Sequence, residues 1–109
     1  NIFKEIASDQ QGFVLQHRAK LKEAEIELAA GRIEESILLL QEISSENEKN
    51  IFADKALFLL GKLYQYGLKD DIQASEMYES LLAKFPNSLY LDEAREEIIK
   101  IREKVKQGT

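Results

Sequence analysis

Apolar residues recur at three- and four-residue steps along most of the chain, the spacing that puts side chains on one face of an α-helix. Such stripes of apolar residues lie near 14–28, 74–85 and 91–105. Segment 57–64 is apolar on nearly every side of the expected helix. The helix containing 57–64 is therefore expected to be the most buried. The pattern predicts an all-α fold. The clearest apolar stripe in the chain comprises Ala74, Met77, Tyr78, Leu81, Leu82 and Phe85.

Turn-forming residues separate these stretches. Gly31 and Gly67 each stand where an apolar stripe ends, and glycine readily takes the left-handed conformation common at helix C-termini. Pro86 is expected to stop one helix, and the Ser88 side chain to cap the start of the next. The predicted elements are helical hairpins at about 14–47 and 51–86, and a last helix at about 89–106.

Corresponding positions recur along the chain with a nearly constant period. Ala19, Ala56 and Ala94 align at shifts of 56 − 19 = 37 and 94 − 56 = 38 residues. Ile43 and Leu81 keep the second shift, 81 − 43 = 38. The predicted organisation is a single domain over 1–109, with the end of a preceding repeat (1–13), a repeat (14–50), a second repeat (51–88) and a C-terminal capping helix (89–109).

One stretch resembles the tetratricopeptide repeat family, because it reads Leu57-x-x-Leu60-Gly61-x-x-Tyr64, then Ala74-x-x-x-Tyr78, then Pro86. The resemblance implies an α-solenoid of antiparallel helical hairpins, with Gly61 where two helices touch. Leu57 replaces the usual tryptophan, and the turn 67–71 is one residue longer than the family pattern. In the first repeat, Ala24 stands in the glycine position and Ser36 in the alanine position.

A second resemblance concerns the run Phe85-Pro86-Asn87-Ser88, with Ala94 six residues after Ser88. It is similar to the longer-period repeats of bacterial cell-envelope proteins, such as the Tol-Pal-associated periplasmic protein and the lipoprotein of the outer-membrane assembly machine. This resemblance implies a location in the bacterial periplasm or cell envelope.

Residues 1–9 align with the second half of a helix, so we also expect a further repeat upstream.

The charge balance narrows the range of partners. The formal net charge is −5 and the basic residues are interspersed with acids, so a nucleic acid is not an expected partner. No uncharged run approaches the ~20 residues of a membrane span, so membrane insertion is not expected. Cysteine is absent, which removes disulfides and thiolate metal sites.

The sequence offers no convincing catalytic, cofactor or metal site. His17 is the one histidine, and it falls within an apolar series, so we expect it to pack between helices. Neighbouring carboxylates on a helix point about 100° apart and do not converge on a metal. The three acidic pairs are therefore expected to be solvated: Glu34-Glu35, Asp70-Asp71 and Glu96-Glu97.

The family resemblance implies a non-catalytic module that binds a peptide or helix of a partner protein in a concave groove. The groove would be lined by the first helix of each hairpin. The alternative is a structural or self-association domain of a larger cell-envelope protein, and an enzyme is a distant third. Phe58 and Leu21 interrupt the order of charged residues that a carboxylate clamp for chaperone tails requires. The positions implied to face the groove are Arg18, Leu21, Glu25, Leu28, Lys55, Phe58, Lys62, Gln65, Glu96 and Lys100.

Overall fold

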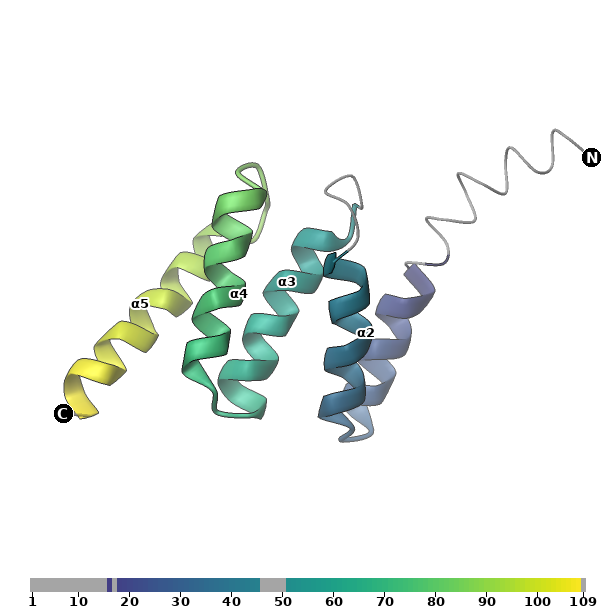
Figure 1. Ribbon diagram of the computed structural model, residues 1–109, viewed down its shortest axis with the longest axis horizontal. Helices are drawn as coiled ribbons and strands as arrows, with labels where there is room; N and C mark the ends of the chain where they lie inside the picture. The colour runs from purple at the N-terminus through teal and green to yellow at the C-terminus, as the bar shows by residue number, and fades with distance from the viewer. Residues whose placement is uncertain (1–15, 17, 46–50, 109) are drawn as a thin grey trace, which may run out of the picture. The chain divides into compact units, whose positions relative to one another are not determined.

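The computed structural model describes residues 16, 18–45 and 51–108, and every regular element within them is helical (Figure 1). The predicted all-α class is confirmed for this part of the chain. Predictions for 1–13 and for His17 lie outside the described residues. The elements are a helix over 18–29, α2 (Ile33–Ser45), α3 (Ala53–Lys62), the π-helix η1 (Leu63–Gly67), α4 (Asp71–Lys84) and α5 (Leu91–Gly108).

The chain divides into two compact units, Asn1–Ala53 and Asp54–Thr109. In the first unit, the helix over 18–29 and α2 run antiparallel. The Ser36 hydroxyl on α2 donates a hydrogen bond of 2.8 Å to the Ala24 carbonyl oxygen, and both residues are buried. The small residues in the glycine and alanine positions of the first repeat therefore lie where the two helices of this hairpin are in contact.

Gly31 ends the first of these helices in the left-handed conformation, with φ +84°, as predicted. The Arg32 N–H donates to the Glu27 carbonyl at 2.8 Å, and the Gly31 N–H donates to the Leu28 carbonyl at 3.0 Å. These two bonds form a Schellman motif, which satisfies carbonyls that the helix would otherwise leave unpaired.

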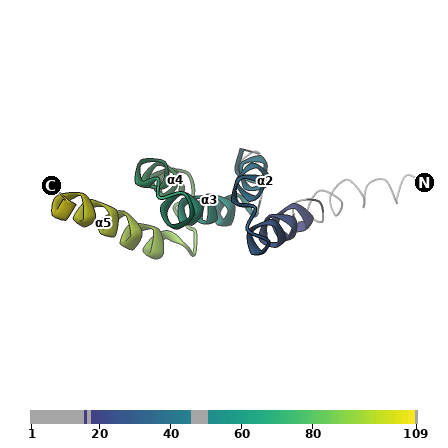
Figure 2. The ribbon, with the colours of Figure 1, turned by 90° about the horizontal axis from the view of Figure 1, so that it is seen from below.

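In the second unit, α3 and α4 form the predicted hairpin and α5 packs against α4; Figure 2 views α4 nearly along its axis. No residue of α3 is exposed, which confirms that this is the most buried helix among those described. A Cβ atom added to Gly61 would lie 2.4 Å from Cε1 of Tyr78 on α4, so the predicted close contact at Gly61 is also confirmed. The core of this unit comprises Leu57, Phe58, Ala74, Tyr78, Leu81, Ala94, Ile98 and Ile101.

The end of the first helix of this hairpin differs from the prediction. The α-helix stops at Lys62 and continues as the π-helix η1, in which the Leu68 N–H donates to the Leu63 carbonyl at 3.0 Å. A π-turn holds one residue more than an α-turn, so it accommodates the extra residue noted in the sequence. Gly67 is not in the left-handed region, and Lys69 takes that conformation instead, with φ 57°.

The remaining helix boundaries follow local capping chemistry. The Asp70 carboxylate accepts the Gln73 N–H at 3.1 Å and so caps the N-terminus of α4. The α4 helix ends before Pro86, as predicted. The Ser88 hydroxyl accepts the Tyr90 N–H at 3.1 Å and donates to Asp54 at 2.7 Å. The α5 helix begins at Leu91, and its first helical bond runs from the Ala94 N–H to the Tyr90 carbonyl at 2.9 Å. Ser88 therefore stabilises the turn that precedes α5 and ties that turn to α3, but it is not the predicted N-cap.

Candidate partner-binding surface

Phe58, predicted to face the groove, lies instead in the core of the second unit with 7% of its surface exposed. Its ring stacks on Tyr90, with centroids 5.1 Å apart and planes inclined by 18°. It also contacts Tyr78 in a tilted arrangement at 6.0 Å. Phe58 therefore joins α3 to the start of α5, and the prediction that it is available to a partner is wrong for this structure.

Gln65 is also buried, because it lies in η1 where the helix widens. Its side-chain oxygen accepts a hydrogen bond of 2.7 Å from the Tyr78 hydroxyl. Burial of that hydroxyl raises the pKa of Tyr78. A buried glutamine with its bond satisfied holds the Tyr78 ring in place and is not presented to a partner.

Lys62 lies beside two aromatic rings on the surface of α3. Its ammonium nitrogen is 4.9 Å from the centroid of Tyr66 and 5.8 Å from that of Phe58, both within cation–π range. The Tyr66 side chain is about half exposed. This pair presents a positive charge and an accessible ring, a combination that is common in protein interfaces.

Glu97, on α5, connects that helix to Tyr66 of η1. Its carboxylate accepts hydrogen bonds from the Tyr66 hydroxyl and from the Lys100 ammonium, the latter at 2.9 Å. Burial opposes the charged form, but these hydrogen bonds outweigh it and hold the pKa of Glu97 below its usual value. The same bonds raise the pKa of Tyr66 and of Lys100.

The prediction that Glu96 and Glu97 are both solvated is therefore wrong for Glu97, which is 5% exposed. The pair also lies well inside α5 and not near its N-terminus. The sequence did not predict this network. Tyr66 and Glu97 are 31 residues apart, which is less than one repeat period. The contact depends on the π-helix, which turns Tyr66 toward α5, so a regular α-helix at these positions does not predict it.

We define the α3–α5 face as Lys55, Lys62, Tyr66, Glu96 and Lys100. Lys55 and Lys62 are partly buried, whereas Glu96 and Lys100 are exposed. Glu96 acts on Lys100 electrostatically, and Lys62 acts on Glu97, so the charges of the two helices lie within reach of one another. The face carries both signs of charge around one exposed ring.

The other predicted groove residues belong to the first unit. Arg18 and Glu25 are exposed on the helix over 18–29, and Leu28 is partly exposed near its end. Leu21 is buried, so its side chain contributes to packing within that unit. The candidate residues of the first unit are therefore two charged side chains and one leucine.

The described residues contain no group of three side chains suited to holding a metal ion. Among the helices that the structure describes, none combines the length and apolar character that crossing a membrane requires.

Comparison with known proteins gives one match. A family model described as a tetratricopeptide repeat matches residues 55–88, which cover most of α3 together with η1 and α4. The comparison with curated proteins and the comparison with solved structures gave no match. The family match gives no support to the resemblance to cell-envelope proteins described above. Residues 55–88 thus combine a tetratricopeptide repeat sequence with its helical hairpin, which supports a tetratricopeptide-like protein and a protein–protein interaction module.

Proposed function

We propose that this chain binds a peptide or helix of a partner protein, and that the α3–α5 face is part of the binding surface. The repeat match over 55–88 supports a non-catalytic interaction module. The single observation that favours this face is the side-by-side presentation of Lys62, Tyr66 and Lys100, which are joined through Glu97.

The internal contacts of this face support a preformed surface. Tyr66 is held by its bond to Glu97, and Lys62 lies against the Tyr66 ring. Side chains that are already fixed lose little conformational entropy when a partner binds. A partner segment with carboxylates near Lys62 and Lys100 and an apolar group against Tyr66 fits this arrangement best.

Site-specific photo-crosslinking in the native host tests the proposal. A photoreactive amino acid replaces Glu96 on the α3–α5 face in one variant and Glu76 on α4 in a matched control. Both glutamates are exposed, and neither has an ion pair to a described residue. We expect crosslinks from position 96 to one other protein, identified by mass spectrometry, and few or none from position 76.

The same experiment separates the two hypotheses made from the sequence. A product from position 96 with twice the mass of the chain would favour the self-association alternative. Equal labelling from both positions, or none from position 96, would contradict the assignment of this face.

A further inference from the structure

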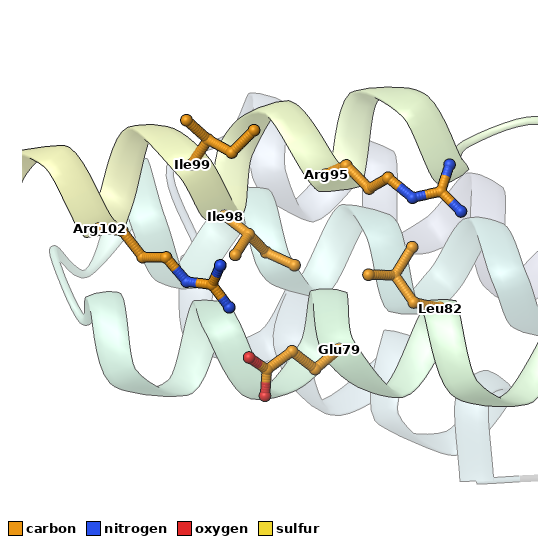
Figure 3. Close-up of a pocket in the computed structure, with 6 residues that line it drawn as sticks. All are labelled: Glu79, Leu82, Arg95, Ile98, Ile99 and Arg102. Atoms are coloured by element: carbon orange, nitrogen blue, oxygen red, sulfur yellow. The ribbon is translucent and has the colours of Figure 1, made fainter.

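The outer surface of α4 and α5 carries a hollow of about 270 Å³ (Figure 3). Its centre is apolar, because Leu82 and Ile98 lie there. Arg95 lies at the end beside Leu82, and Arg102 lies at the end beside Glu79. The lining residues are Glu79, Leu82, Arg95, Ile98, Ile99 and Arg102.

The repeat period explains why a hollow occurs here. A shift of 38 residues, which takes Ala56 to Ala94, also takes Leu60 to Ile98 and Gly61 to Ile99. On α3, the surface around Gly61 is covered by α4 through Tyr78. The hollow on α5 is thus the equivalent of the surface on which α4 packs, so its shape suits a helix.

Two differences alter which helix would fit. Ile99 replaces Gly61 and is 51% exposed, so an incoming helix needs a small residue opposite it, the reverse of the Gly61–Tyr78 contact. The same shift takes Leu57 to Arg95 and Tyr64 to Arg102. An apolar position of α3 and an aromatic position of η1 are therefore replaced by positive charges at the two ends of the hollow.

These charges are only partly balanced by acidic side chains. Arg95 has one ion pair, with the exposed carboxylate of Asp92 at 3.3 Å. Arg102 forms no ion pair with any described acidic residue. In a chain of net charge −5, a patch with two arginines and one glutamate is locally positive. Charge complementarity favours an acidic occupant.

We propose that the hollow is a docking site for an amphipathic helix of a partner protein, with a small residue at the centre of its apolar stripe. On the partner helix, two acidic residues flank the apolar stripe about 10 Å apart. That distance is two helical turns and matches the spacing of Arg95 and Arg102 along α5. On α5 these arginines lie on the side away from Glu96 and Lys100, since successive residues are rotated by about 100°. The site is therefore independent of the α3–α5 face.

A second copy of this chain fits less well. A two-fold pairing of the hollows would bring the two arginines of each copy against those of the other. Like charges at that distance repel, and only Glu79 is present in the lining to compensate. A helix that carries its own acidic residues meets no such repulsion.

A charge-swap titration tests the proposal. The probes are two labelled peptides of about 18 residues with one leucine stripe and a central alanine. One has two glutamates seven residues apart beside the stripe, and the other has lysines there. Fluorescence anisotropy measures their binding to the chain, to Arg95→Glu/Arg102→Glu, and to the control Lys22→Glu/Lys84→Glu, whose lysines are exposed outside the hollow.

We expect the chain and the control variant to prefer the glutamate peptide. The arginine variant should bind the glutamate peptide roughly tenfold more weakly and gain affinity for the lysine peptide. A gain of binding cannot come from unfolding, so the swap separates docking from lost stability. Equal binding of both peptides to all three proteins would overturn the proposal. A dimer in sedimentation that Arg95→Glu/Arg102→Glu abolishes would overturn it in favour of a second copy.

Discussion

Replacing Gly61 with alanine would put a Cβ atom 2.4 Å from Cε1 of Tyr78 and 2.7 Å from its Cδ1 and Cζ. Carbon atoms not bonded to each other pack at about 3.5–4.0 Å, so the ring or the backbone of α3 must shift by more than an ångström. Tyr78 has no exposed surface, and its hydroxyl is bonded to the buried Gln65. The ring therefore has little freedom to move.

The magnitude follows from opposing terms. Forcing extra volume into a packed core costs about 1–3 kcal/mol. A ring shift that breaks the Tyr78–Gln65 bond costs about 1 kcal/mol more. Alanine is a better helix former than glycine, which returns about 1 kcal/mol, because Gly61 lies in α3. We expect Gly61→Ala to lower the free energy of unfolding by about 1–3 kcal/mol.

Urea denaturation followed by far-ultraviolet circular dichroism measures this change. A double-mutant cycle with Tyr78→Leu isolates the contact, because a smaller side chain leaves room for the new methyl group. In that background Gly61→Ala should cost much less or become stabilising. If Gly61→Ala stabilised the otherwise unchanged chain by about 1 kcal/mol, helix propensity alone would explain it and the close-packing argument would fail.

Further predictions concern charge, capping and the last helix. Glu97→Gln should cost about 1–3 kcal/mol at neutral pH, because it weakens charge-assisted hydrogen bonds in a buried site. Since the folded pKa of Glu97 lies below 4.5, the difference should persist down to that pH and shrink as pH falls through the folded pKa; a pH-independent difference in urea melts would contradict this. Asp70→Ala should cost about 0.5–2 kcal/mol by removing the cap on α4, and an unchanged urea midpoint would argue against that cap. Deleting 89–109 should expose the α4 core and cause aggregation or loss of helicity, whereas a monomer with an unchanged thermal midpoint would show that α5 is dispensable.

Features set by local pattern could be predicted from the sequence. The repeat motif around Gly61 and Tyr78 predicted both the hairpin and the close approach of its helices at Gly61. Gly31 predicted a helix end because its role depends on neighbouring residues alone. Periodicity and capping act within a few residues, so the sequence displays them directly.

The candidate site was harder to predict, because its geometry depends on a departure from helical regularity. The π-helix after Lys62 turns Gln65 inward and Tyr66 toward α5, whereas a regular α-helix was assumed for these positions. The sequence predicts that Glu97 is solvated, but in the structure it is buried and bonded to Tyr66 and Lys100. Such placement depends on contacts between residues distant in sequence, which a single stripe of apolar residues does not encode.

The most direct test of the account is the affinity of the chain for the partner that crosslinks from position 96. Isothermal titration would compare the chain with Lys62→Ser on the α3–α5 face and with Lys84→Ser on α4 as the control. We expect Lys62→Ser to raise Kd about three- to tenfold, corresponding to roughly 1 kcal/mol, and Lys84→Ser to leave it unchanged. Equal affinities for all three proteins would contradict the claim that this face binds the partner.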